Sequence, residues 1–314
     1  MKINDISKDD IKSVIEEAYN KFKSVDAGKN ASYIPYLKNV DKNLFGISIC
    51  LPDGTLIEKG DISYKFGIES ISKVPTAILA LQQFGGKEVI NKIGADATGL
   101  NFGSIFAILL EKDHPSTPLV NAGAISACSL IKPIGDADGK WNEIISNINN
   151  LCGSETEVID ELYKTESDTN FNNRAIIWLL KGYNRIYDDP LMSLDLYTRQ
   201  CSIGVTCSQL SILAGTIANK GENPVTGKQV FNPIISHQIT SMIATVGMYE
   251  ETGDWMFESG IPAKSGVGGG IIAVYPGQMG ICVFSPPLNP IGNSVKGKLC
   301  IDFIAKKLGL SIYQ

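Results

Sequence analysis

The stretch "FGIESISKVP", Phe66–Pro75, places Ser70 and Lys73 three residues apart at the start of an apolar, helix-like segment. Serine is common where helices start and lysine is a good helix former, so the pair can be ordinary helix-start chemistry. Alternatively, the two side chains share one face of a helix, which would put the lysine amine within reach of the serine hydroxyl. Spacing alone leaves both interpretations open, because "SLIK", Ser129–Lys132, repeats it.

A second motif favours a nucleophilic serine. Lys264-Ser265-Gly266 lies in "IPAKSGV", a segment with the pattern of a strand. Active-serine enzymes that lack a catalytic histidine combine S-x-x-K on a helix with K-[ST]-G on a strand beside the cleft. A lysine accepts the serine proton only when it is uncharged, and both burial and a second cation favour that form. We therefore predict Ser70 as the nucleophile, Lys73 as its base and Lys264 as the second cation. The alternative is two unrelated lysines on a surface helix and an edge strand.

The composition indicates a folded, globular protein that acts on small molecules. The chain has 314 residues, of which 44% are hydrophobic, enough to bury a sizeable core. A net charge of -5 without a basic run argues against nucleic acid as a partner. The polar amino terminus "MKINDISKDD" lacks the apolar region of a signal peptide, and no stretch approaches the roughly 18 apolar residues of a membrane span. We expect a cytoplasmic protein without membrane association, whose seven scattered cysteines are reduced.

Strand patterns occur at both ends of the chain and helix patterns between them. Apolar spacing predicts an amphipathic helix over 7–25, and two apolar runs around Pro52-Asp53-Gly54 predict antiparallel strands near 45–59. Helix-length segments separated by Gly, Pro and Asn then fill 70–253. Strand patterns return after that point, and a final amphipathic helix begins at Ser294.

This order of elements predicts an α+β fold in one catalytic domain, 1–314. The strands from the two ends must meet to share one antiparallel sheet, flanked by the terminal helices, in a sheet lobe formed by 1–68 and 255–314. A helical lobe, 69–254, is inserted between them. We expect the site in the cleft between the two lobes.

Several common catalytic and metal motifs are missing from the sequence. Its two histidines, His114 and His237, lie in polar surroundings away from other catalytic groups, which argues against a Ser-His-Asp triad. Cys201 and Cys207 have no partner pair at the spacing of a zinc site and are most simply core thiols. We therefore predict neither a cofactor nor a bound metal.

Eight short blocks of the chain together resemble the serine-dependent glutaminases, whose fold is like that of the β-lactamases and penicillin-binding transpeptidases. The resemblance spans Tyr33 to about Gly297 and implies the compact bacterial type, assembled as a homodimer or homotetramer and without a cofactor. It implies that the chain hydrolyses L-glutamine to L-glutamate and ammonia through a γ-glutamyl ester on Ser70. The blocks are, in order, "SYIPYL", "SISK", "NAGAI", "NRA", "YTRQCSI", "GMY", "PAKSGVGGG" and "GNS".

The resemblance also implies roles for individual residues. Ser70 is the nucleophile and part of the substrate site, Lys73 is its base or proton relay, and Tyr249 lies near both with Lys264. The backbone N–H of Val267 would join that of Ser70 in an oxyanion hole. The residues implied for the amino-acid end of glutamine are Tyr33, Asn121, Glu166, Asn173 and Tyr197.

Two positions depart from the family pattern, Glu69 in place of Gln and Thr117 in place of Asn before Pro118. A Glu69 carboxylate that points into the site would raise the pKa of Lys73, whereas one that points outward would change nothing. Two other functions stay open. A β-lactam-recognising acyltransferase shares the two lysine motifs but works outside the cytoplasm, and a catalytically inactive amino-acid sensor would not need them intact.

Overall fold

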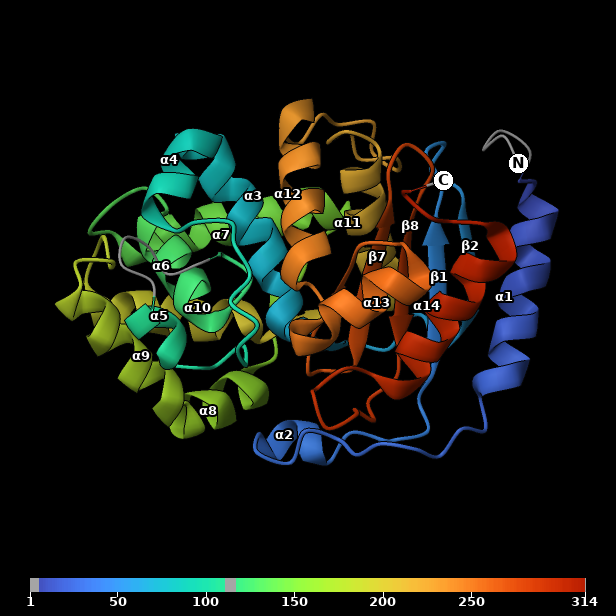
Figure 1. Ribbon diagram of the computed structural model, residues 1–314, viewed down its shortest axis with the longest axis horizontal. Coiled ribbons are helices and arrows are strands. Elements are labelled where there is room, and N and C mark those ends of the chain that lie inside the picture. Colours follow the sequence, from blue (N-terminus) through green and yellow to red (C-terminus); the bar gives the residue numbers. More distant parts are fainter. Residues whose placement is uncertain (1–5, 111–116, 314) are drawn as a thin grey trace.

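A five-stranded antiparallel sheet joins the two ends of the chain in the computed structural model, which describes residues 6–110 and 117–313 (Figure 1). The strand order is β2-β1-β8-β7-β6, so that β1, near the start of the chain, pairs with β8, near its end. In this pair Ser48 lies opposite Cys282. The predicted meeting of the terminal strands is therefore confirmed. The strands are β1 (Gly46–Cys50), β2 (Leu56–Gly60), β6 (Ala263–Ser265), β7 (Gly270–Tyr275) and β8 (Met279–Phe284).

Both faces of this sheet are covered by helices. Successive side chains of a strand point to opposite faces, and in β8 Ile281 joins the core beneath the terminal helices whereas Cys282 joins the core beneath α11. Burial on both faces explains why β7 and β8 are apolar at nearly every position. The covering helices are α1 (Lys8–Phe22) and α14 (Val295–Leu308) on one face and α11 (Cys207–Ala218) on the other.

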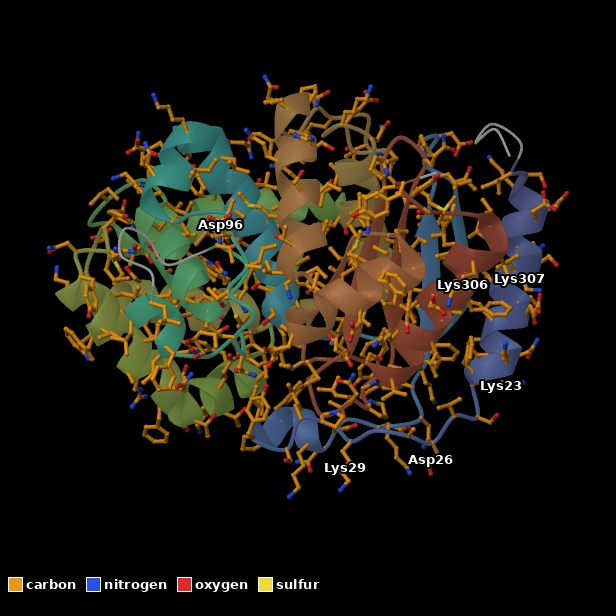
Figure 2. All side chains as sticks on the ribbon, in the orientation of Figure 1. Lys23, Asp26, Lys29, Asp96, Lys306 and Lys307 are labelled. Atoms are coloured by element: carbon orange, nitrogen blue, oxygen red, sulfur yellow. The ribbon has the colours of Figure 1, made fainter. Side chains whose placement is uncertain are left out.

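The two terminal helices start where the sequence predicts. Ser7 and Asp10 form a capping box at the start of α1, and the Ser294 side chain accepts a hydrogen bond from the backbone N–H of Gly297 at the start of α14. The helices lie side by side, and an ion pair of 3.0 Å joins them at the surface, between Glu17 of α1 and Lys307 of α14, which Figure 2 labels. These contacts fix the outer layer of the sheet.

The other end of the molecule is mainly helical (Figure 1). Its helices pack around a core that includes Ile78, Ile125, Ile148 and Leu213. They are α3 (Lys73–Phe84), α4 (Gly86–Lys92), α5 (Phe106–Leu110), α6 (Asn121–Leu130), α7 (Ala137–Cys152), α8 (Asp160–Thr169), α9 (Phe171–Gly182) and α10 (Pro190–Cys201). Between the two ends lie α12 (Pro233–Val246) and α13 (Thr252–Ser259), and α2 (Pro35–Lys38) packs against α8.

A second, three-stranded sheet joins the segment just before Ser70 to two short strands of the helical part of the chain. Its order is β3-β5-β4, with both pairs antiparallel. Strands of two or three residues carry too little alternation to be recognised in a sequence, so this sheet was not predicted. Through it the chain that leads to Ser70 is hydrogen-bonded to the segment after α10. The strands are β3 (Phe66–Gly67), β4 (Glu157–Val158) and β5 (Ile203–Val205).

All seven cysteines are buried and free, as expected for reduced thiols. Of the helices within residues 6–110 and 117–313, none is long and apolar enough to cross a membrane.

The contact between α11 and the sheet predicts a sensitive position at Gly280. A Cβ on Gly280 would lie 2.0 Å from the backbone nitrogen of Gly215, so Gly280→Ala should push the helix away from β8. We expect a loss of about 1 to 3 kcal/mol in the free energy of unfolding, measured by urea denaturation. Gly182→Ala is the control, because a Cβ there meets nothing within 4 Å. Equal stability of the two variants would contradict this close packing.

Candidate active site

Ser70 and Lys73 lie together at the start of α3. Ser70 is in a short 3-10 turn, η2 (Glu69–Ser72), and Lys73 is the first residue of the helix that follows. The Lys73 Nζ donates a hydrogen bond of 2.5 Å to the Ser70 Oγ, and both side chains are buried. Glu69 adopts a left-handed backbone with φ of 50°, which is strained for a residue with a side chain. The turn therefore holds Ser70 in a fixed position above Lys73.

Lys264 and Tyr249 complete the polar group around Ser70. The Lys264 Nζ donates to the carbonyl oxygen of Ser265 at 2.6 Å and lies 4.5 Å from the centre of the Tyr249 ring. The Tyr249 hydroxyl donates to the same carbonyl at 3.1 Å, and the Ser70 side chain acts to lower the pKa of Tyr249, although burial raises it overall. Tyr249 begins a second 3-10 turn, η3 (Tyr249–Glu251), and it too has a left-handed backbone, with φ of 57°.

The environment favours uncharged lysines. Burial lowers the pKa of Lys73, although Cys201, Glu69 and Glu166 act in the opposite direction. The pKa of Lys264 falls well below its usual value because of burial and the neighbouring Lys73. An uncharged amine beside a serine hydroxyl can accept its proton, which is the chemistry that the two lysine motifs predict.

The glycines after Lys264 bring the loop that follows β6 against the turn that holds Ser70. A Cβ on Gly266 would lie 2.9 Å from the carbonyl oxygen of Ile68, and one on Gly268 would lie 2.2 Å from that of Gly67. Only glycine allows so close an approach of two backbones. Val267 lies between these glycines and is therefore held beside the turn that contains Ser70.

Three of the predicted substrate-binding side chains form one hydrogen-bonded row. The Asn121 Nδ2 donates to the Asn173 Oδ1 at 3.0 Å, and the Tyr197 hydroxyl donates to the Asn121 Oδ1 at 3.3 Å. The Lys73 Nζ lies 5.6 Å from the centre of the Tyr197 ring, which places the row beside the Ser70–Lys73 pair. Asn121 and Asn173 come from α6 and α9, so the fold brings together residues that are far apart in sequence.

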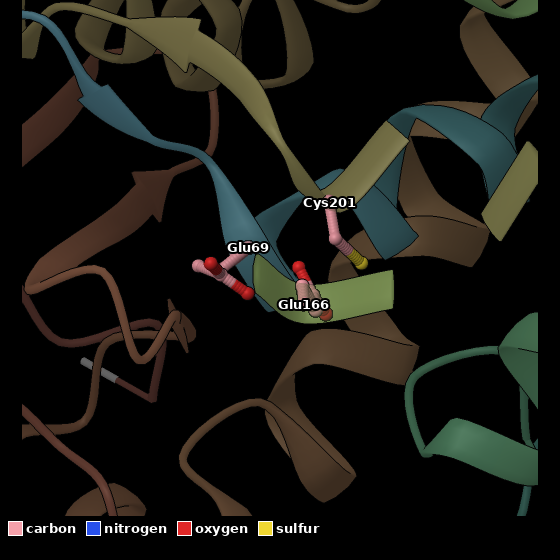
Figure 3. Close-up of side chains that lie close together, drawn as sticks. All are labelled: Glu69, Glu166 and Cys201. Atoms are coloured by element: carbon pink, nitrogen blue, oxygen red, sulfur yellow. The ribbon is translucent and has the colours of Figure 1, made fainter. Parts of the chain in front are cut away.

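Glu166 lies on α8 and is buried beside two residues that the sequence did not assign to the site. An oxygen of Glu166, an oxygen of Glu69 and the Cys201 sulfur lie within 4.8 Å of one another (Figure 3). The Ser202 hydroxyl donates to Glu166 at 3.4 Å, and burial raises the pKa of Glu166 to about 7. Glu69 therefore points into the site, whereas Cys201, predicted to be a core thiol, lies at the site's inner wall.

Tyr33 lies at the entrance to the site rather than inside it. Its side chain is 59% exposed and lines a cavity of about 630 Å³ together with Val267. Phe102, another lining residue, packs against the Tyr249 ring with 4.6 Å between the ring centres. The sequence gives no signal for Phe102, because it lies in a loop outside the eight blocks. The other lining residues include Asn101, Leu288 and Gly292.

The structure separates the second S-x-x-K from any such chemistry. The Ser129 hydroxyl donates to the Ser126 carbonyl at 2.7 Å, and Lys132 is exposed with its amine 4.9 Å from the centre of the Phe84 ring. His237 is exposed on α12, away from Ser70, and His114 lies outside the described residues.

The sequence matches the Glutaminase family model over residues 28–313. The chain belongs to the glutaminase family. The glutaminases of Bacteroides thetaiotaomicron and Parabacteroides distasonis are each 65% identical to it over 304 residues, which is 97% of this chain and 95% of each relative.

Solved structures of other family members have the same fold. A probable glutaminase, ybaS, superposes with a TM-score of 0.96 at 42% identity. The match covers 98% of this chain and 100% of the ybaS chain. A probable glutaminase from Bacillus subtilis, solved with 6-diazo-5-oxo-L-norleucine, has a TM-score of 0.82 at 29% identity. The match covers 97% of this chain and 95% of the Bacillus subtilis chain. The predicted α+β fold of the β-lactamase type, with an antiparallel sheet and inserted helices, is confirmed.

The two S-x-x-K motifs predict opposite results when each serine is replaced. Ser70→Ala should lower turnover by several orders of magnitude while the protein stays folded, because no other hydroxyl is bonded to Lys73 among the described residues. Ser129→Ala should keep most of the activity, since it removes only a structural hydrogen bond. Steady-state kinetics with circular dichroism would check both. Loss of activity in Ser129→Ala alone would show that the nucleophile is misassigned.

Proposed function

We propose that this chain hydrolyses L-glutamine to L-glutamate and ammonia through a γ-glutamyl ester on Ser70. The observation that carries the proposal is the buried hydrogen bond between Lys73 and Ser70, with Lys264 held close by. Membership of the glutaminase family supports the substrate, and so does the name of the relatives that match nearly the whole chain. Neither a cofactor nor a metal takes part in the steps below.

In the first half of the reaction, Ser70 attacks the side-chain amide carbon of glutamine. The uncharged Lys73 amine accepts the hydroxyl proton as the carbon–oxygen bond forms. The backbone N–H groups of Ser70 and Val267 donate to the oxygen that becomes negative. The carbon–nitrogen bond then breaks, and the leaving nitrogen takes the proton from Lys73, with Tyr249 positioned to pass it. Ammonia departs and the γ-glutamyl ester remains.

In the second half, water takes the place of the serine. Lys73, uncharged again, accepts a proton from the water that attacks the ester carbon. The same two backbone N–H groups stabilise the tetrahedral oxygen. The bond to Ser70 breaks, the proton returns to the Ser70 Oγ, and L-glutamate leaves. Atoms and charges balance with water as the sole co-substrate.

The amino-acid end of glutamine would bind in the row of amides and tyrosines. Glu166 supplies a negative charge for the α-ammonium, and Asn121, Asn173 and Tyr197 offer hydrogen bonds to the α-carboxylate end. Tyr33 covers the ligand from the entrance side. A related structure supports such a site. It is described as Mglu in its glutamate form, and it matches this chain with a TM-score of 0.92 at 30% identity.

The remaining proposals concern the whole molecule. We take 1–314 as one catalytic domain, with a sheet lobe, 1–68 and 255–314, and a helical lobe, 69–254. The active form is a homodimer or homotetramer that works in the cytoplasm, where the free, buried thiols stay reduced.

Amide selectivity tests the reaction itself. The protein should release ammonia from L-glutamine far faster than from L-asparagine, whose shorter side chain cannot place its amide at Ser70 while its ammonium reaches Glu166. The same rate is expected with EDTA present. A coupled ammonia assay on both amides, with and without chelator, gives the answer. Equal rates on the two substrates, or loss of activity on chelation, would refute the proposed reaction.

Recognition of the free amino group depends on the charge of Glu166. Glu166→Gln keeps the shape of the side chain but removes its charge, so kcat/KM for L-glutamine should fall. The expected loss is equivalent to about 2 to 4 kcal/mol of free energy, as for truncated buried charge pairs. In the same variant, the ratio of kcat/KM for L-glutamine to kcat/KM for a glutamine with an acylated α-amine should become smaller. Kinetics on both substrates measures the two effects. If neither quantity changes, Glu166 does not contact the substrate.

A further inference from the structure

We infer that Glu69 is a second carboxylate of the subsite for the α-ammonium group, so that Glu69 and Glu166 together set the preference for a free amino acid. This inference rests on the proposed hydrolysis of L-glutamine. It concerns a residue that neither the motif reasoning nor the family resemblance assigned to the substrate. Three features of the structure support it: an unpartnered carboxylate oxygen, a cradle of glycines and the charge of the surroundings.

The Glu69 carboxylate is buried without a full set of partners. The residue is 3% exposed, and its Oε1 has no hydrogen-bond partner among residues 6–110 and 117–313. Its carboxylate lies in the same cluster as the Glu166 carboxylate and the Cys201 sulfur, all within 4.8 Å (Figure 3). A buried carboxylate oxygen without a donor is costly, so this oxygen is suited to a ligand that brings a donor with it.

Glycines make the space that the Glu69 side chain occupies. A Cβ on Gly67 would lie 3.4 Å from the Glu69 Oε1, and Cβ atoms on Gly266 and Gly268 would lie 3.5 Å and 3.3 Å from its Cβ and Cγ. A side chain at Gly268 would crowd Glu69, and side chains at Gly67 and Gly266 would be in contact with it. Glu69 also holds a left-handed backbone, where glycine or asparagine would be less strained. A strained, enclosed carboxylate directly before Ser70 indicates a functional rather than a structural residue.

The charges around the pair favour a cationic ligand. The two nearby lysines do not neutralise it fully, because burial lowers the pKa of both. An ammonium group has three N–H donors, and the Glu69 oxygen and Glu166 can accept two of them. The other titratable groups that face Glu69 are Lys73 on α3, Tyr197 and Cys201 on α10, Tyr249 on η3 and Tyr33 before α2, with Lys264 of β6 beside Lys73.

The pair should exchange a proton for the ammonium group. Burial and the nearby Glu166 raise the pKa of Glu69 well above its usual value, and burial raises that of Glu166 to about 7. Near neutral pH the pair therefore holds a proton, which an arriving ammonium must displace. As pH rises, this competition weakens, so the preference for L-glutamine over an analogue without the α-amine should increase. That analogue is 4-carbamoylbutanoate.

The decisive variant is Glu69→Gln, with Glu161→Gln, an exposed acid on the same helix as Glu166, as the control. The ratio of kcat/KM for L-glutamine to that for 4-carbamoylbutanoate is measured from mildly acidic to alkaline pH. In Glu69→Gln the ratio should fall on the order of tenfold or more. The increase of the ratio with pH should also occur at lower pH, because the pKa of Glu166 falls when its negative neighbour is removed. In Glu161→Gln the ratio and its pH dependence should match the unsubstituted protein.

Three results, from kinetics and from calorimetry, would overturn the inference. If the unsubstituted protein hydrolyses L-glutamine and Glu69→Gln has the same ratio at every pH, the inference fails while the proposed function stands. If the unsubstituted protein hydrolyses neither amide, the proposed function fails and the inference with it. If Glu69→Gln keeps the ratio but abolishes Zn²⁺ binding seen by calorimetry in the unsubstituted protein, the cluster is a metal site instead.

A second measurement avoids any change at Glu69. Ser70→Ala, which cannot form the ester, is titrated with L-glutamine near neutral pH in buffers of different ionisation enthalpy. Calorimetry should show a proton released on binding of L-glutamine and none on binding of 4-carbamoylbutanoate. Binding of L-glutamine without proton release would contradict the exchange and overturn the inference.

Discussion

The hydrogen bond between the buried amine of Lys73 and the hydroxyl of Ser70 is the interaction on which the rest of the site depends. An amine in water holds its proton at neutral pH, whereas burial favours the form that can accept one. Lys73 is 1% exposed and Lys264 is fully buried, so the fold keeps both amines away from water. Keeping them there requires elements from both ends of the chain. The sheet, the helices and the glycine loop can all be understood as ways to meet this requirement.

The pairing of β1 with β8 and the close contact of the loop after β6 with the turn around Ser70 bring the two lysine motifs together. The contact of this loop with the turn depends on backbones that approach more closely than side chains allow, at Gly266 and Gly268. Burial lowers the pKa of Lys73, and the acidic pair of Glu69 and Glu166 partly offsets that lowering in the absence of a ligand. An ammonium group bound to that pair would offset its charge. Substrate binding would then favour the uncharged form of the base, which links recognition to catalysis.

Local sequence signals were enough to predict the terminal helices, the first hairpin and the contact between Ser70 and Lys73. Ser7 with Asp10 and Pro52-Asp53-Gly54 act over a few residues, so their outcome does not need the rest of the fold. The direction of the Glu69 side chain could not be predicted, because it depends on glycines that lie about 200 residues later in the chain. Cys201 looked like a core thiol for the same reason. The short strands of the second sheet carry too few residues for any pattern.

The central claim is that Ser70, activated by Lys73, attacks the substrate, and labelling with a glutamine-shaped electrophile tests it most directly. The protein is treated with 6-diazo-5-oxo-L-norleucine, the compound named in the Bacillus subtilis structure. Its intact mass is then measured and its peptides are mapped. The account predicts a single adduct, on the peptide that contains Ser70, which L-glutamine protects against. An adduct on another residue, or none in a protein that hydrolyses L-glutamine, would contradict it.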